Sequence, residues 1–259
     1  MKPNTLIIRT AGTNCDRELA HAFQLAGADT HTLHLNELIE HPDRLETFDI
    51  VGFPGGFSYG DDISAGRIFA NRLRHRLYEP LLAAIDRGVP MIGICNGFQV
   101  LVKLGLLPDP HASEQLVTLA DNTLGRFIDK WTPMAADPAS ACVWTKGLDP
   151  FDLPIAHGEG RLAVRNDNVL QQLREQGQIA LRYAPGHNPN GSADDIAGLC
   201  DPTGLVLGLM PHPERFVDPT QHPQWTRRGD KFLQAEAPGL TFFRNAVQHV
   251  QTPTNVNAG

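Results

Sequence analysis

Cys95 lies in the sequence Gly93-Ile94-Cys95-Asn96-Gly97, directly after a short apolar run. A G-x-C-x-G sequence between a predicted strand and a predicted helix has the form of a nucleophile elbow, where the flanking glycines leave room for a sharp turn. The helix predicted to begin at Asn96 would direct its first N–H groups at the sulfur and favour the thiolate, which attacks carbonyl carbons. The alternative is a buried cysteine packed between glycines. Cys95 is therefore our candidate nucleophile.

A cysteine nucleophile needs a proton carrier, and His212 is the best candidate. It lies in Met210-Pro211-His212-Pro213-Glu214-Arg215, directly after an apolar run. A residue before proline is biased toward an extended backbone, in which residues two apart face the same side. We therefore expect the Glu214 carboxylate to accept a ring N–H from His212 and to fix its tautomer. The alternative is a proline-stiffened surface loop that carries one of the eleven histidines.

The sequence Pro54-Gly55-Gly56 ends another short apolar run. Consecutive glycines let the backbone approach a ligand closely. An N–H group of Gly55 or Gly56, together with that of Asn96, would form an oxyanion hole. Alternatively the diglycine is only a loop. It is not a phosphate-binding loop, because no G-K-[ST] follows it.

Strands and helices alternate in the first half of the chain, which predicts a parallel sheet with helices on both faces. The predicted strands are residues 5–9, 30–35, 48–53 and 90–94, and the predicted helices are residues 16–26, 63–86 and 96–104. The candidates thus follow predicted strands, and open α/β sheets bind their ligands at the carboxyl ends of strands.

The second half contains shorter strands, a helix near residues 169–176 and a hairpin formed by residues 196–199 and 205–210. We interpret residues 217–238 as a surface loop and residues 239–250 as a final helix. Without a clear linker, we expect a single domain over residues 1–250 and a flexible tail at residues 251–259.

Composition limits the function classes. The 259 residues are 41% hydrophobic and 20% charged, with a net charge of −7, which argues against nucleic-acid binding as the main task. With no long apolar run and no charged-then-apolar leader, we expect a cytoplasmic protein without membrane contact. The four cysteines are too scattered to predict a metal site, and disulfides are not expected in that compartment.

Several longer blocks carry a resemblance to a known family. They are GTNCDRELAHAF (12–23), PGGFSYGDD (54–62), GICNGFQVLVKLGLLP (93–108), IAHGEGRL (155–162), NPNGSADDIAGLCDPTG (188–204) and VLGLMPHPER (206–215). The chain resembles the glutamine amidotransferase subunits of phosphoribosylformylglycinamidine synthase (small form), which are class I, or triad, amidotransferases. This resemblance implies a doubly wound, flavodoxin-like fold with a mostly parallel sheet.

The resemblance also implies a function. It assigns Cys95, His212 and Glu214 as the triad that hydrolyses L-glutamine, with the substrate near Gly56, Gln99 and the turn His157-Gly158-Glu159. It further implies a synthetase partner that uses ATP and Mg²⁺, a small accessory subunit, and no cofactor in this chain. Two alternatives stay open, a stand-alone cysteine hydrolase such as a γ-glutamyl hydrolase, and a non-catalytic assembly subunit on the same scaffold.

Overall fold

The computed structural model describes residues 1–252 and is built around a nine-stranded mixed sheet. The strand order is β2-β1-β3-β4-β11-β10-β9-β6-β7. The first five strands in this order are mutually parallel: β2 (Asp29–His34), β1 (Asn4–Arg9), β3 (Ile50–Phe53), β4 (Met91–Ile94) and β11 (Val206–Leu209). The order 2-1-3-4 is that of a flavodoxin-like sheet. The predicted doubly wound, mostly parallel sheet is confirmed.

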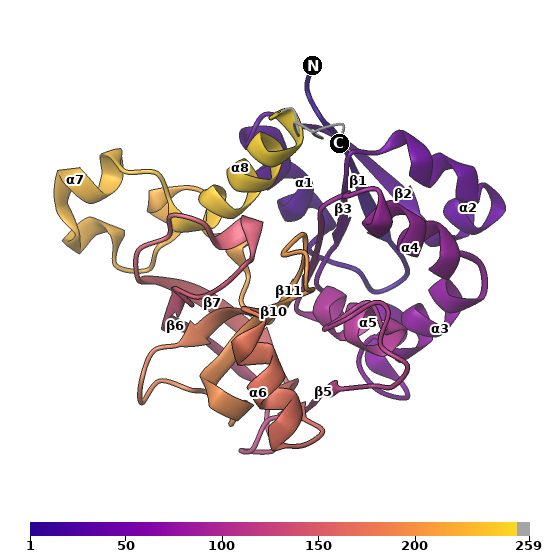
Figure 1. The fold of residues 1–259 in the computed structure, drawn as a ribbon. Helices are drawn as coiled ribbons and strands as arrows, with labels where there is room; N and C mark the ends of the chain where they lie inside the picture. Colours follow the sequence, from indigo (N-terminus) through magenta and orange to yellow (C-terminus); the bar gives the residue numbers. More distant parts are fainter. Residues whose placement is uncertain (253–259) are drawn as a thin grey trace, which may run out of the picture.

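Buried apolar runs form the centre of this sheet because both faces are covered. All residues of β3, β4 and β11 are buried. On one side, α1 (Asp16–Leu25) packs against α8 (Pro238–Gln251), and on the other α3 (Arg67–Arg76) packs against α5 (Asn96–Leu104), as Figure 1 shows. The remaining helices of the first half are α2 (Leu35–Glu40) and α4 (Tyr78–Asp86). The predicted helix over residues 63–86 is thus two helices, and residues 63–66 before them are not helical.

The second half of the chain extends the sheet with antiparallel strands. These are β10 (Ile196–Cys200), β9 (Ile179–Tyr183), β6 (Ile128–Ala136) and β7 (Phe151–His157). The predicted hairpin is confirmed as β10 and β11. A separate two-stranded sheet joins β5 (Val117–Asp121) to β8 (Glu159–Val164), and α6 (Asp167–Glu175) follows it.

The structure differs from the sequence interpretation at three places. Residues 217–238 are not a plain loop, because they contain two short 3₁₀ turns and α7 (Gly229–Gln234). The first turn is stabilised by a capping box, in which the Asp218 and Gln221 side chains accept backbone N–H groups. The second predicted strand ends at His34, whose Nδ1 accepts the Asn36 N–H and caps α2. The predicted tail begins with Gln251 still in α8, and residues 253–259 lie outside the described residues.

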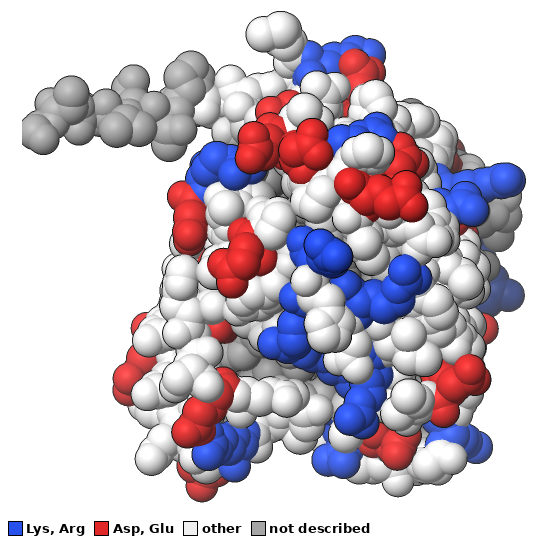
Figure 2. All heavy atoms as spheres, turned by 90° about the vertical axis from the view of Figure 1, so that its right-hand side faces the viewer, with Lys and Arg blue, Asp and Glu red and all other residues white. Residues whose placement is uncertain are grey.

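Among residues 1–252, no helix has the length and apolar character that a membrane crossing requires. Positive charge is unevenly distributed on the surface. Figure 2 shows a band of Lys and Arg side chains on the face turned toward the viewer. The helix α3 alone carries four arginines. The net charge of the chain therefore does not describe this face.

Candidate active site

Cys95 lies on a strained turn between β4 and α5. Its φ of 53° is in the left-handed region, which is unusual for a residue with a side chain. The two glycines of the motif are required by space. A Cβ atom on Gly97 would lie 2.0 Å from the Phe53 carbonyl oxygen, and one on Gly93 would lie 2.7 Å from the Gly97 carbonyl oxygen. The sequence interpretation as a nucleophile elbow is consistent with this geometry.

His212 and Glu214 meet as the sequence suggested, but on a different backbone. Residues 213–215 form a 3₁₀ turn, so the expected extended segment is wrong beyond His212. The turn still brings the His212 Nδ1 atom to 2.7 Å from Glu214 Oε1, and both side chains are buried. The His212 backbone N–H donates to the Pro154 carbonyl at 2.9 Å, which anchors the segment to β7. These bonds hold the pair in place against the end of the sheet.

The environment of His212 favours its charged form. Burial lowers the pKa of His212, but the Glu214 carboxylate and the nearby sulfurs of Cys15 and Cys95 outweigh this, and its pKa lies well above the usual value. The Cys95 sulfur lies 3.6 Å from the Ala156 carbonyl oxygen.

The diglycine segment is fastened to the loop after β1. The Gly55 carbonyl accepts the N–H groups of Asn14 and Cys15, both at 3.3 Å. In a trans peptide the C=O and the following N–H point in opposite directions, so the Gly56 N–H points away from this loop. Gly56 lines the same cavity as Cys95. Asn96 is the first residue of α5, so its N–H lacks an acceptor within the helix.

Gly55 has a packing role that the sequence did not suggest. A Cβ atom there would lie 2.9 Å from His212 Cε1, 3.2 Å from Cys15 Sγ and 3.5 Å from Cys95 Cβ. A glycine is therefore needed at position 55, because the histidine and the two cysteines leave no room for a side chain.

A cavity of about 470 Å³ opens beside Cys95. The structure places four predicted residues in its wall, namely Gln99, His157, Gly158 and Glu159. Charged and aromatic side chains that sequence reasoning did not select complete the wall, and they are Asp61, Asp121, Arg126, Phe57 and Phe127. No spacing rule identifies these residues, because they come from separate loops.

A hydrogen-bond network holds the predicted binding residues in place. The Gln99 amide donates to the Glu159 carbonyl at 2.5 Å and accepts from the Asn96 side chain at 2.9 Å. The Asn96 side chain in turn accepts the Ser58 N–H at 3.3 Å and donates to Asp61 at 3.2 Å. Gln99 and Asn96 of α5 thus connect two segments around the cavity, residues 58–61 and the turn at Glu159.

This chain is similar to known proteins in both sequence and fold. A family model described as the CobB/CobQ-like glutamine amidotransferase domain matches residues 2–250. The phosphoribosylformylglycinamidine synthase subunit PurQ of Dehalococcoides mccartyi is 48% identical over 252 residues, which cover 95% of this chain and 97% of that protein. The chain belongs to the PurQ family of glutamine amidotransferases. The PurQ subunit of Methanococcus maripaludis is 40% identical over 95% of this chain and 97% of its own.

Solved structures agree with this family assignment. A chain in the structure of PurLQS from Thermotoga maritima matches with a TM-score of 0.73 and 30% identity, covering 96% of this chain and 100% of that chain. A glutamine amidotransferase of the same organism matches with a TM-score of 0.58 at 15% identity, covering 98% and 100%. The second match supports the amidotransferase fold alone.

His157, in the wall of the cavity beside Cys95, is a neutral residue. Burial, reinforced by the charge of His212, lowers the pKa of His157 to about 4. The Asn122 side chain donates to the His157 and Arg126 carbonyls, so its oxygen is left to accept from His157 Nδ1 at 3.0 Å. The tautomer with a proton on Nδ1 follows from this arrangement.

We expect His157 to destabilise the fold in acid. In the unfolded chain His157 gains its proton near pH 6.5, but in the folded chain only near pH 4. The contribution of neutral His157 to the free energy of unfolding is thus fully present above pH 6.5. It is lost as the pH falls from 6.5 to 4, by roughly 3 kcal/mol. Urea unfolding at pH 7 and pH 4.5 should therefore show a smaller loss of stability for His157→Gln than for the wild type. An identical pH dependence in the two proteins would contradict the assigned pKa.

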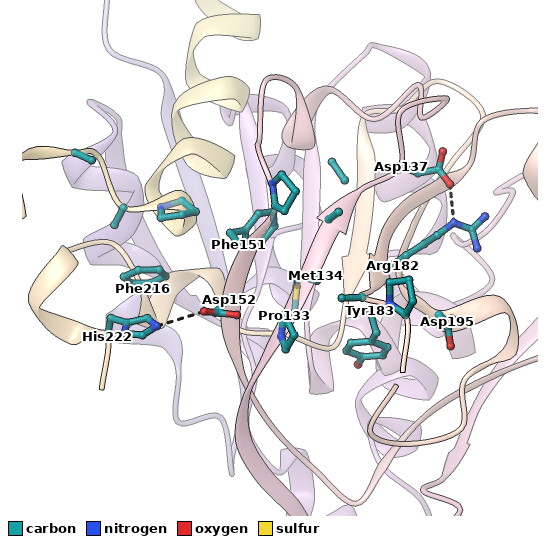
Figure 3. A pocket seen from close by; sticks show the side chains of 18 of the residues that line it. Pro133, Met134, Asp137, Phe151, Asp152, Arg182, Tyr183, Asp195, Phe216 and His222 are labelled. Atoms are coloured by element: carbon teal, nitrogen blue, oxygen red, sulfur yellow. Dashed lines mark hydrogen bonds and ion pairs between the residues drawn. The ribbon is translucent and has the colours of Figure 1, made fainter. Parts of the chain in front are cut away.

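A larger cavity of about 940 Å³ lies elsewhere, between β6, β7, β9 and the segment that carries α7. Its wall is rich in apolar side chains, including Phe151 and Phe216. Figure 3 shows two ion pairs in the same wall, between Asp152 and His222 and between Asp137 and Arg182. Cys95 does not line this cavity, so cavity size alone would select the wrong place for the chemistry.

Proposed function

We propose that this chain hydrolyses L-glutamine through a cysteinyl thioester at Cys95 and supplies the ammonia to a synthetase subunit in purine biosynthesis. The observation that carries the proposal is the convergence of Cys95, His212 and Glu214 at the carboxyl ends of β4 and β11, beside a cavity large enough for glutamine. The family assignment supports the same conclusion.

The reaction proceeds in two steps. The Cys95 thiolate attacks the side-chain amide carbon of glutamine, and the resulting oxyanion accepts N–H groups of Gly56 and Asn96. His212 gives its proton to the departing ammonia as the C–N bond breaks, which leaves a glutamyl thioester. His212 then takes a proton from water, the hydroxyl attacks the thioester, and glutamate and the Cys95 thiolate are released. Glu214 orients His212 and stabilises its cationic form.

The charged groups of the cavity suggest how glutamine is oriented. Arg126 offers a guanidinium for the α-carboxylate, and Asp61, Asp121 and Glu159 offer carboxylates for the α-ammonium group. Burial raises the pKa of Asp61. The neighbouring hydrogen-bond donors, the Gly66 N–H and the Asn96 amide, oppose this rise. Gln99, His157 and Gly158 also line this cavity.

We expect Arg126→Met to raise the KM for glutamine roughly tenfold with little change in kcat, since one charged contact to the ground state is worth about 1.4 kcal/mol. The matched control is Arg165→Met, because Arg165 pairs with Glu114 and does not line the cavity. A fall in kcat at constant KM would show that Arg126 does not act by binding the substrate.

The assembly follows from the family. We infer that this chain acts with a PurL synthetase subunit and a small PurS subunit, as the names in the Thermotoga maritima complex indicate. In this scheme the synthetase subunit uses ATP and Mg²⁺, and the glutaminase step needs no cofactor. The unpaired cysteines fit a reducing compartment, the cytoplasm.

The test is ammonia release from glutamine by the purified chain, alone and with the synthetase, its nucleotide and its substrate. We expect activity that rises in the complete assembly. Equal activity under all conditions would favour the stand-alone hydrolase, and no activity under any condition would favour a non-catalytic subunit.

A further inference from the structure

Cys15 is a second thiol at the active site, although nothing in the sequence pattern separates it from the other buried cysteines. It directly precedes α1 and is 1% exposed. Its S–H donates to Asn14 Oδ1 at 3.1 Å, and its sulfur accepts from Arg215 Nη2 at 3.0 Å. The thiol therefore bridges the loop after β1 to the turn that carries the triad.

The Cys15 sulfur also lies against the triad itself. It is within 4.8 Å of a ring nitrogen of His212 and of a carboxylate oxygen of Glu214. Among the described residues, the buried His212 Nε2 atom has no hydrogen-bond partner of regular geometry. Gly55 completes the packing, because its Cα hydrogen faces the imidazole, Cys15 and Cys95 together.

These three side chains do not form a good cation site. The Arg215 guanidinium is already bonded to the sulfur, so a cation bound there would be repelled. The His212 Nδ1 atom is bonded to Glu214 and is not free to coordinate a metal. The contacts of Cys15 are instead those of a residue that holds neighbouring side chains of the triad in place.

We propose that Cys15 is a positioning residue for the His212–Glu214 pair, since its sulfur packs against the imidazole and holds the Arg215 guanidinium. This inference rests on the proposed glutaminase function. Arg215 follows Glu214 directly in the chain, and its cation would weaken the Glu214–His212 attraction if it turned toward the carboxylate. Arg215 already feels the charge of Glu214, and by holding the guanidinium on its sulfur Cys15 limits a closer approach to that carboxylate.

The charges around His212 make this role measurable. The facing groups are Glu214 and Arg215 from its own turn, Cys15 from the loop before α1, Cys95 from the elbow, and His157 from β7. Burial lowers the pKa of His212, and the contacts with Glu214, Cys15 and Cys95 raise it. Removing the Cys15 sulfur should therefore lower this pKa. Because the cationic form protonates the leaving ammonia, the alkaline limb of the kcat profile should move to lower pH.

The experiment compares Cys15→Ala, Cys15→Ser and the control Cys200→Ala in the complete synthetase complex. Cys200 is also buried, but its sulfur faces the Gly177 carbonyl and not the triad. We expect Cys15→Ala to lower glutamine-dependent kcat on the order of 10- to 100-fold, with ammonia-dependent synthesis unchanged. Cys15→Ser should recover part of the rate and part of the pH profile, because its hydroxyl can still bridge Asn14 and Arg215.

A second variant guards against a simple folding defect. Arg215→Met removes the partner of the sulfur, and in combination with Cys15→Ala it should cost less than the sum of the two single changes. If Cys15→Ala kept the wild-type rate and pH profile, or if the losses were additive and the profile unmoved, the inference would be overturned. Cys95→Ala in the same assay separates the two proposals, since normal glutamine use in that variant would contradict the glutaminase mechanism itself.

Discussion

Replacing Cys95 by alanine should abolish glutamine-dependent synthesis by the assembled enzyme and leave ammonia-dependent synthesis intact. Only the amide-splitting step needs the thiolate, so loss of the sulfur should lower the glutaminase rate by roughly 10⁴-fold or more. The measurement is product formation by the complex with glutamine and, separately, with ammonium salts at alkaline pH.

Two controls make this result specific. Cys142→Ala and Cys200→Ala remove buried thiols that lie outside the cavity beside Cys95, and neither should change turnover much. Retained ammonia-dependent synthesis shows that the Cys95 variant still folds and assembles. If Cys95→Ala used glutamine normally, another nucleophile would have to be sought.

Removing the imidazole should be almost as severe. His212→Ala eliminates the acid of the first step and the base of the second, and we expect a loss on the order of 10⁴-fold in kcat. Glu214→Gln keeps the shape of the pair at 2.7 Å but removes the charge that stabilises cationic His212. Its loss should be smaller, roughly 10²- to 10³-fold, and the alkaline limb of the profile should shift to lower pH.

Glu214→Asp is a useful companion variant because it retains the charge and shortens the reach. A carboxylate at a longer distance should recover part of the rate that Glu214→Gln loses. An unchanged rate for His212→Ala, or for Glu214→Gln, at neutral pH would remove that residue from the catalytic group.

The elements that carry the site were predictable because each has a local cause. The apolar runs before Gly55, Cys95 and His212 are short and continuous, which indicates strands buried on both faces, and the structure has them as β3, β4 and β11. The carboxyl ends of neighbouring parallel strands meet at one edge, so the triad could be assembled from the sequence. The pairing of His212 with Glu214 was predicted, although the backbone between them is a 3₁₀ turn.

Contacts between distant loops were not predictable in this way. Cys15 and Arg215 are 200 residues apart, and no periodicity relates them. The Asn122 side chain orients His157 from another loop, and Arg126 reaches the cavity from the same loop. Residues 217–238 appeared polar and irregular, yet tertiary packing of Phe232 against the core gives part of them a helical form. These features depend on the assembled fold and not on local propensity.

Trapping the acyl intermediate tests the assignment of Cys95 as the nucleophile most directly. The complete complex is mixed with isotopically labelled glutamine, quenched in acid within the first turnovers, digested, and analysed by mass spectrometry. We expect a glutamyl thioester on the peptide that contains Cys95, and none in Cys95→Ala. The Glu214→Gln complex should accumulate more of this thioester if its hydrolysis is slowed more than its formation. A glutamyl adduct on Cys15, or steady ammonia release from glutamine by the Cys95→Ala complex, would contradict the assignment of Cys95 as the nucleophile.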